Sequence, residues 1–228
     1  MRQPMIKFRN QVSPVSRINR RSFLQYAGVS AVGVAFVSAG CQKEEKFEGF
    51  YLGSGDVGLL NYLYVLEQLE AAFYTQLTGS FYSGATEIEK ALLSDIRDHE
   101  IAHREFFKNA LGQVAIPTFE ANFTTVNFGS RESVLATAKI FEDVVVSAYN
   151  GSGAFFKESK YLTLASQIVS VEARHAALIR NLIATGSFAN NEVIDANGLD
   201  NSQLPSEVLV IVQPYIKAEI NATDLPDL

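Results

Sequence analysis

The chain has 228 residues, of which 47% are hydrophobic and 19% are charged, and its formal net charge is −6 at pH 7. These proportions are those of a globular protein with a sizeable core, and they exclude a largely disordered chain. The acidic balance makes nucleic acid, or an anionic lipid surface, a poor match as a partner.

The first 40 residues differ from the rest, because they contain six Lys and Arg residues and no Asp or Glu. A modest apolar run follows over residues 23–39, which is too short and too rich in glycine for a membrane span. This pattern is typical of an export signal. The Arg20-Arg21 pair and its neighbours resemble the twin-arginine signal, which passes folded proteins across the bacterial inner membrane. We therefore expect residues 1–40 to direct export and the protein to be periplasmic.

The one cysteine of the sequence, Cys41, directly follows Ser38-Ala39-Gly40 at the end of the apolar run. This arrangement resembles a lipoprotein box, so we expect Cys41 to be lipidated and to anchor the protein to the envelope. Ordinary signal cleavage after Ala39 is the alternative. A single cysteine excludes an intramolecular disulfide. Loss of residues 1–40 leaves 13 basic and 25 acidic residues, a net charge of −12.

Residues 41–56 are polar and are expected to form a tether, after which apolar residues recur at spacings of three and four. Such spacing predicts amphipathic helices. Ser130 is the expected N-cap of the third helix, with Ser133 as the other candidate. The segment Asn150-Gly151-Ser152-Gly153 is expected to end or kink that helix. The four long helices are expected over residues 57–78, 85–111, 130–149 and 159–185.

Residues 113–130 contain Pro117 and interleaved phenylalanines, and we expect them to form a long irregular crossover pinned by these aromatic side chains. Two helical hairpins joined by one long crossover are typical of ferritin-like four-helix bundles. We therefore predict an all-α fold in which residues 57–185 form the bundle. A C-terminal extension over residues 186–228 is expected to contain one short helix near residues 206–219.

Two of the three histidines follow a glutamate at a distance of three residues. The pairs are Glu100–His103 in the second expected helix and Glu172–His175 in the fourth. Residues three apart share a helix face, so each pair can hold one metal ion. A single pair of this kind is usually an exposed pair on a helix, since charged residues mostly lie at the surface. The second pair, in the matching helix, makes chance a poor explanation.

The first and third helices each carry a Glu that is followed seven residues later by a Tyr. Seven residues are two turns, so Glu67 shares a face with Tyr74, and Glu142 shares a face with Tyr149. Together with the Glu-x-x-His pairs they form an internal repeat, in which the Glu-to-Glu intervals are 33 and 30 residues. One Glu from each of two helices and one Glu-x-x-His from each of the other two are the ligands of di-iron and di-manganese carboxylate sites. The predicted metal ligands are Glu67, Glu100, His103, Glu142, Glu172 and His175.

Four carboxylates and two imidazoles can offset the charge of two divalent ions in a buried place, where unpaired carboxylates would be costly. We therefore predict two iron ions, or two manganese ions, as the cofactor. Glu70 shares the face of Glu67, but its counterpart in the second copy is Val145, so the repeat favours Glu67 as the ligand. Glu70 is expected beside the ligands or at the bundle edge. Tyr74 and Tyr149 are expected to hydrogen-bond the ligands or simply to pack in the core.

His99 introduces a competing motif, because His99-Glu100-Ile101-Ala102-His103 satisfies H-E-x-x-H, the zinc-peptidase signature on a helix. In that interpretation the two histidines bind zinc and the glutamate is the general base. It leaves the glutamates of the other three helices unexplained. The counterpart of His99 in the repeat is Val171, which favours a position for His99 beside the ligands or at the surface.

Several segments resemble the bacterial ferritin-like domain family that includes desiccation-related proteins. The resemblance covers residues 56–220 and implies a ferritin-like bundle, often exported, with an iron or manganese pair at the six ligand positions named above. The segments that carry it are Leu60-Asn61-Tyr62, residues 66–74, Asp98-His99-Glu100 with His103, Phe141-Glu142-Asp143 and Ala148-Tyr149-Asn150-Gly151.

The leading functional hypothesis is an exported di-metal protein that reacts with oxygen or peroxide in metal or oxidative-stress handling. The candidate enzyme is then a ferroxidase- or peroxidase-like oxidoreductase with no catalytic residues beyond the metal ligands. One alternative is a non-catalytic stress or desiccation-related bundle in which the metal pair is a staple, and another is the zinc peptidase. A lipid anchor on every subunit argues against a 24-subunit storage cage, whereas a smaller homo-oligomer stays open.

Overall fold

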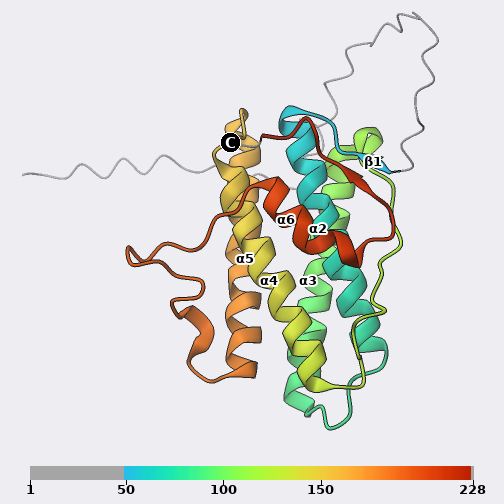
Figure 1. The fold of residues 1–228 in the computed structure, drawn as a ribbon, viewed down its shortest axis with the longest axis vertical. Helices are drawn as coiled ribbons and strands as arrows, with labels where there is room; N and C mark the ends of the chain where they lie inside the picture. Colours follow the sequence, from blue (N-terminus) through green and yellow to red (C-terminus); the bar gives the residue numbers. More distant parts are fainter. Residues whose placement is uncertain (1–48, 227–228) are drawn as a thin grey trace, which may run out of the picture. The chain divides into compact units, whose positions relative to one another are not determined.

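A computed structural model describes residues 49–226 of the protein. The export signal expected over residues 1–40 and the expected lipidation site Cys41 lie outside the described residues. Four long helices dominate the described part (Figure 1), which confirms the predicted all-α four-helix bundle. Within residues 49–226, no helix combines the length and the apolar character that crossing a bilayer requires. The long helices are α2 (Gly55–Gly79), α3 (Glu87–Leu111), α4 (Arg131–Gly153) and α5 (Ser159–Ile183).

Local side-chain chemistry explains where two of these helices begin. α3 follows Thr86, whose hydroxyl accepts a hydrogen bond from the Glu89 backbone N–H, while the Glu89 carboxylate accepts one from the Thr86 backbone N–H. This reciprocal arrangement pairs two backbone amides near the helix start that would otherwise lack partners. α4 follows Ser130, whose side chain accepts a hydrogen bond from the backbone N–H of Ser133. α3 ends at Leu111 and is capped by Gly112, which has a φ of +56° that glycine adopts without strain.

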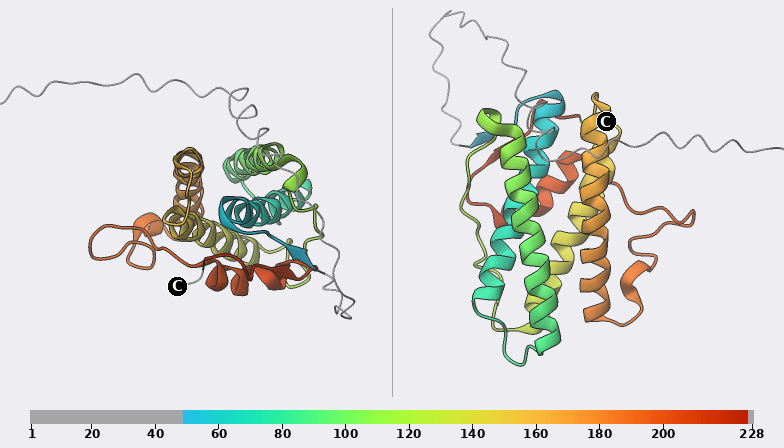
Figure 2. Two further views of the ribbon diagram at one scale, coloured as in Figure 1. Left: turned by 90° about the horizontal axis from the view of Figure 1, so that it is seen from above. Right: turned by 180° about the vertical axis from the view of Figure 1, so that it is seen from behind.

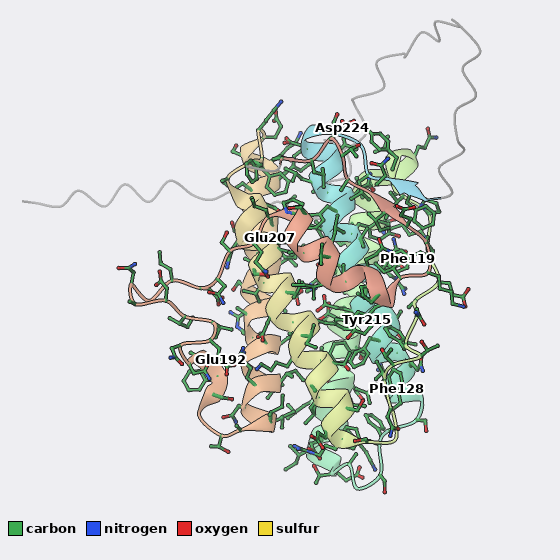
Figure 3. The ribbon with its side chains drawn as sticks, in the orientation of Figure 1. Phe119, Phe128, Glu192, Glu207, Tyr215 and Asp224 are labelled. Carbon is green, nitrogen blue, oxygen red and sulfur yellow. The ribbon has the colours of Figure 1, made fainter. Side chains whose placement is uncertain are left out.

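The helices pair as two hairpins, α2 with α3 and α4 with α5, and Figure 2 shows this pairing from above. The hairpins are joined by a crossover that begins with η1 (Gly112–Val114) and continues to residue 130. Phe123 and Phe128 of the crossover contact Phe73 of α2, with ring centroids 5.7 and 5.6 Å apart. Figure 3 labels Phe128 beside the bundle. Aromatic side chains therefore hold the crossover against the first hairpin.

α2 is buried on all sides, since every residue from Gly58 to Ala71 is buried. A helix of this kind must be covered by other elements on every face. The C-terminal extension supplies part of the cover, because α6 (Pro205–Val212) and η3 (Gln213–Tyr215) cross over α2 and α4 (Figures 1 and 2). Tyr215 packs edge-on against Phe141 of α4, with ring centroids 4.8 Å apart.

The end of the extension pairs with residues just ahead of α2. Strand β2 (Ile220–Asn221) lies parallel to β1 (Phe50–Tyr51), in the register Phe50 with Ile220. Leu52, directly after β1, is fully buried. Residues 50–52 fall within the segment 41–56 that the sequence predicts as a tether, and this part of it is packed on the domain.

Two helix ends differ from the expectation. α4 passes the expected bound at residue 149 and ends at Gly153, the last residue of the segment that was expected to end or kink it. Gly151 serves close packing there, since a Cβ on it would lie only 1.9 Å from the backbone oxygen of Gln203. α6 ends at Val212 rather than near residue 219, because Pro214 lacks the N–H that would continue the helix and the chain turns into η3.

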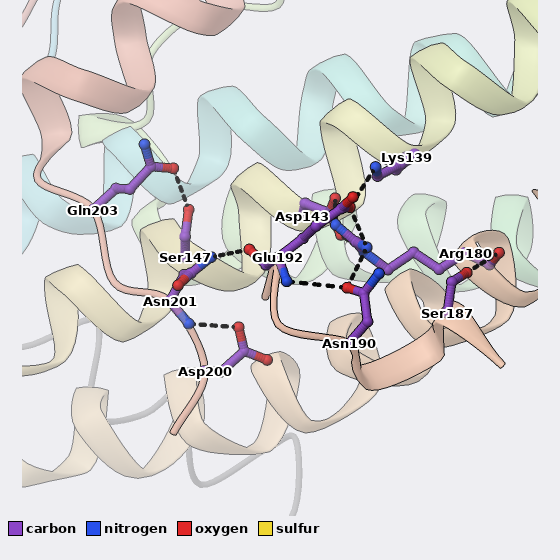
Figure 4. A network of polar contacts seen from close by, with 10 residues as sticks. All are labelled: Lys139, Asp143, Ser147, Arg180, Ser187, Asn190, Glu192, Asp200, Asn201 and Gln203. Carbon is purple, nitrogen blue, oxygen red and sulfur yellow. Dashed lines mark hydrogen bonds and ion pairs between the residues drawn. The ribbon is translucent and has the colours of Figure 1, made fainter. Parts of the chain in front are cut away.

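The loop after α5, which contains η2 (Ser187–Ala189), is fixed by Arg180 of α5, whose side chain is 4% exposed. The guanidinium makes two hydrogen bonds of 2.7 Å to the carboxylate of Asp143 in α4. It also donates to Glu192 at 3.0 Å and to Asn190 at 3.2 Å, and Lys139 of α4 donates to Glu192 as well (Figure 4). A bidentate pair holds both partners in a defined geometry. This network therefore ties the loop to α4 and α5 together.

Candidate metal centre

The inner faces of the four long helices carry a cluster of carboxylates and imidazoles. One Glu from each helix lies there, and none of the four is exposed to solvent. They are buried because each stands on the face of its helix that the apolar pattern turns towards the bundle interior. The structure thus brings together the six residues predicted as ligands. The cluster consists of Glu67 of α2, Glu100 and His103 of α3, Glu142 of α4, and Glu172 and His175 of α5.

The side chains of this cluster form two overlapping groups of four. In each group, one nitrogen or oxygen atom from every member lies within 4.8 Å of the others. Glu100 and Glu172 belong to both groups, so their carboxylates lie where they can bridge two ions. Glu67 and His103 complete the first group, and Glu142 and His175 complete the second.

The Nδ1 atom of His103 points into the first group. It lies 2.6 Å from Glu172 Oε1, 3.4 Å from Glu67 Oε2 and 3.6 Å from Glu100 Oε2. Within residues 49–226, none of these four atoms has a hydrogen-bond partner of acceptable geometry. Several lone pairs therefore converge on one buried point, which is the arrangement that a bound cation requires.

The Nδ1 atom of His175 has the matching surroundings in the second group. It lies 2.8 Å from Glu100 Oε1, 3.2 Å from Glu172 Oε2 and 3.7 Å from Glu142 Oε2. The shortest contact of each of these two histidines is to the Glu of the other Glu-x-x-His pair. The site therefore has the pseudo-twofold symmetry that the sequence repeat predicts.

Glu67 and Glu142 each belong to only one of the two groups, and we call them the outer glutamates. Each accepts a hydrogen bond from a tyrosine in the other half of the repeat. Tyr74 of α2 donates a hydrogen bond of 2.5 Å to Glu142 of α4, and Tyr149 of α4 donates one to Glu67 of α2. The spacing explains the exchange, because seven helical residues span about 10.5 Å, too far for a Tyr to reach its own Glu. The sequence places each Tyr on the correct face but does not name its partner.

Burial and neighbouring charges shift the proton affinities of the cluster. Burial, together with the charge of Glu172, raises the pKa of Glu67 to about 8. Glu172 itself is buried too, but its close contacts with the imidazoles of His103 and His175 hold its pKa below the ordinary value. Burial lowers the pKa of His175, and its contacts with two carboxylates outweigh this and raise it to about 11. The carboxylates therefore need positive partners, which the two histidines supply only in part.

Unpartnered oxygen atoms and donor types both fit a pair of metal ions at this cluster. Buried acceptors without a donor are costly, and native proteins keep few of them. A set of carboxylate oxygens and imidazole nitrogens suits divalent iron, manganese or zinc. Within the described residues, the atoms without a hydrogen-bond partner here include Glu67 Oε2, both oxygens of Glu100, Glu142 Oε2 and Glu172 Oε1.

His99 lies behind the cluster rather than within it. It is exposed on α3, and its Nδ1 lies 2.9 Å from Nε2 of His175, with the two ring planes only 8° apart. A neighbour on the far nitrogen of a metal-binding imidazole orients the ring. His99 belongs to neither ligand group, so the structure does not place it with His103 around one ion, as a zinc peptidase would need. The sequence could not show the contact of His99 with His175, because the two lie on different helices.

Glu70 is also part of this region. Its side chain is fully buried, so it does not lie at an exposed edge of the bundle. Burial raises its pKa well above the ordinary value. Its oxygens are not among the two groups of mutually close ligand atoms.

A comparison with protein families agrees with this geometry. The family model of the ferritin-like domain matches residues 55–185, which contain all four long helices and every residue of the cluster. A search of curated proteins finds no match to the chain. On the extent of the family match, the chain belongs to the ferritin-like domain family.

Proposed function

We propose that the protein binds two iron ions, with manganese as the alternative, and reacts with oxygen or peroxide outside the cytoplasm. The observation that carries this proposal is the pair of overlapping ligand groups that share Glu100 and Glu172. When bound, two adjacent redox-active ions supply electrons to an oxidant in a site that organic substrates do not need to enter. The candidate activity is therefore that of a ferroxidase- or peroxidase-like oxidoreductase.

The carboxylates, the histidines and the tyrosines have different roles in binding the ions. Four carboxylates match the charge of two divalent ions, which offsets the cost of burying them. Glu100 and Glu172, which belong to both groups, would contribute oxygens to both ions, and His103 and His175 would each hold one of them. The outer glutamates are kept in place by the tyrosine hydroxyls of the opposite hairpin. Because the four glutamates are fully buried, the site favours small oxidants over bulky organic substrates.

The edge between α3 and α5 is the candidate route for such a small molecule. The side chain of His103 is 13% exposed, whereas the side chains of Glu67 and Glu172, which it contacts, are fully buried. The exposed residue His99 lies on the same helix, one turn before His103. His103 is therefore the most exposed side chain of the cluster, and we infer that an oxidant enters past its imidazole.

The location rests on the sequence ahead of the described residues. The basic and apolar pattern of residues 1–40 supports export, and Cys41 supports a lipid anchor on the periplasmic side of the envelope. An anchored protein would meet metal ions and oxidants there, and the acidic net charge favours cations over nucleic acid as partners. The anchor also argues against a 24-subunit storage cage.

A second candidate function is a non-catalytic stress or desiccation-related bundle. It is favoured by the fact that the cluster draws ligands from all four helices, so that bound ions would staple both hairpins together. The two functions make the same claim about the metal and differ only in whether the loaded site reacts.

Metal analysis of the full chain tests the site. We expect two iron or manganese ions per chain in the wild type and fewer than one in the variant Glu67→Ala plus Glu142→Ala. The control is Glu87→Ala plus Glu132→Ala, which removes two exposed glutamates from the same bundle and should keep both ions. A single zinc ion that survives the loss of Glu67 and Glu142 would overturn the di-metal proposal.

Oxidant consumption then separates the two functions. Ferrous iron is added to the metal-free protein, and the uptake of oxygen and of peroxide is followed against free ferrous iron in the same buffer. The redox function predicts uptake above the free-iron rate that disappears in the Glu67→Ala plus Glu142→Ala variant. Two bound irons without such uptake would exclude the redox function and support the non-catalytic bundle.

A further inference from the structure

Glu70 is a buried carboxylate for which the six-ligand site provides no role. It lies on α2, one turn after Glu67, and its exposure is 0%. Neither of its oxygens has a hydrogen-bond partner within the described residues. Glu89 provides the contrast, because that buried carboxylate accepts hydrogen bonds from Thr86 and Arg131. A carboxylate buried without such partners is costly, so a compensating group should bind it in the working protein.

The helix geometry directs Glu70 towards the metal cluster. Residues three and four apart share a helix face, and Glu70 lies three residues after Glu67 and four before Tyr74. Tyr74, on the same face, donates a hydrogen bond to Glu142 of α4. Glu142 belongs only to the group around His175, and Glu100 is shared. Glu70 therefore lies on the His175 side of the cluster.

The carboxylate of Glu70 has no counterpart in the other half of the sequence repeat. The counterpart of Glu70 in the second copy is Val145, which is 2% exposed and can bind no metal ion. The counterpart of His99, which contacts His175, is Val171. Both departures from the repeat thus add polar groups to the same half of the cluster, and neither is repeated around His103.

We propose that Glu70 is a fifth carboxylate ligand of the metal centre and makes the position beside His175 the stronger of two unequal cation sites. This inference rests on the proposed di-metal function. The oxygens of Glu70 lie outside the two close groups, so ligation requires a rotation of its side chain about its flexible single bonds. The position beside His175 is then faced by four carboxylates, and the position beside His103 is faced by three. A divalent cation should fill the position with the larger negative charge first.

The first test measures affinities with Mn(II) and the metal-stripped full chain by isothermal titration calorimetry. We expect two ions whose dissociation constants differ by at least about tenfold. In Glu70→Gln the tighter constant should weaken by at least about tenfold, so that the two become similar. Glu89→Gln is the matched control, since it neutralises a buried carboxylate of the same bundle away from the cluster, and it should leave both constants unchanged.

The second test needs no variant at Glu70. With histidines labelled with ¹⁵N and one equivalent of Zn(II), a diamagnetic probe, the Nδ1 resonance of His175 should shift while that of His103 stays in place. The exposed His99 can be replaced by Gln to assign its own signal. Two equivalents should shift both ligand resonances.

The outcomes separate this inference from the proposed function. If the wild type binds no metal pair, both the proposed function and the role of Glu70 are overturned. A wild type that binds two ions of equal affinity, or a Glu70→Gln variant with unchanged constants, overturns the role of Glu70 alone. A purely structural role for Glu70 would instead lower the thermal stability of the stripped variant and leave its metal constants untouched.

Discussion

Glu67 and Glu142 each accept a hydrogen bond from a tyrosine that belongs to the other half of the repeat. Each hairpin therefore positions the outer ligand of its partner. A shift of α2 relative to α4 would disturb both glutamates at once. The two metal positions are for this reason coupled through the protein as well as through the shared carboxylates.

Removal of one tyrosine hydroxyl should be costly in spite of the small change in volume. We expect Tyr149→Phe to lower the free energy of unfolding of the metal-stripped protein by about 1–3 kcal/mol, because a buried carboxylate oxygen loses its donor. Urea denaturation measures this loss. Tyr62→Phe is the control, since the Tyr62 hydroxyl is equally buried on α2 but has no partner within residues 49–226. Equal losses in the two variants would contradict the assigned role of the hydrogen bond.

Single residues were predictable from the sequence to different degrees. The spacing within each helix leads to the six clustered residues, because helical periodicity decides which side chains share a face. It does not lead to the contact between His99 and His175, which depends on how α3 and α5 pack. Nor does it decide the burial of Glu70, since most helical glutamates are exposed and only tertiary packing reveals the exception.

At the scale of elements, Glu89 links the start of α3 to the start of α4. Its carboxylate accepts hydrogen bonds from the backbone N–H of Thr86 and, at 2.7 Å, from the guanidinium of Arg131. Burial would raise the pKa of Glu89, but these hydrogen bonds outweigh it and hold the pKa below the ordinary value. A carboxylate with a lowered folded pKa stabilises the protein above its unfolded pKa, and this contribution is lost as the pH falls through the folded pKa.

We therefore expect Glu89→Gln to lower the free energy of unfolding by about 1 kcal/mol at pH 7, with a loss that shrinks as the solution becomes acidic. Thermal denaturation of wild type and variant over a series of pH values measures the difference. Comparison at each pH cancels the titration of the distant metal cluster, because separate sites contribute additively. A difference that stays constant down to strongly acidic pH would show that the charge of Glu89 is not the cause.

The close approach of the C-terminal extension to α4 gives a second prediction for an element. Gly151→Ala should destabilise the protein by about 1–3 kcal/mol, since the new Cβ meets the backbone oxygen of Gln203 and overpacking outweighs the gain in helix propensity. Gly153→Ala in the same helix is the control. Its Cβ would make only an ordinary contact of 3.6 Å with Leu162, so it should be neutral or stabilising. Thermal denaturation compares the two, and limited proteolysis should cut the segment before α6 faster only in Gly151→Ala.

The sequence predicts a helix or strand correctly where the element is long and its apolar residues recur periodically. The four long helices were predicted for this reason. The Asn150–Gly153 segment was expected to end or kink α4, and the helix ends at its last residue. The sequence did not show that Gly151 also leaves room for the backbone of Gln203. The β1–β2 pair has two residues in each strand and joins segments far apart in the chain, so no local pattern indicates it.

At the scale of the molecule, the metal cluster is the point where all four long helices meet. Loaded metal should therefore stabilise the whole bundle, by about 4 kcal/mol when free metal exceeds its dissociation constant a thousandfold. We expect chelation to lower the unfolding temperature and to speed amide hydrogen exchange in the middle of α2, α3, α4 and α5 together. Faster exchange confined to one hairpin would contradict a site that joins both.

The parallel pairing of β1 and β2 has a mechanical consequence. A pull on the chain ahead of residue 50 would load this strand pair in shear, against the hydrogen bonds from the Phe50 N–H to Glu219 and from the Leu52 N–H to Asn221. The hydrogen bond from Tyr51 to Asp224 and the buried side chain of Leu52 resist the same displacement. Force would reach α2, which begins at Gly55, only after the β1–β2 pair separates. In a protein anchored by its N-terminal segment, the β1–β2 pair would keep tension on the anchor from reaching the helices that carry the metal ligands.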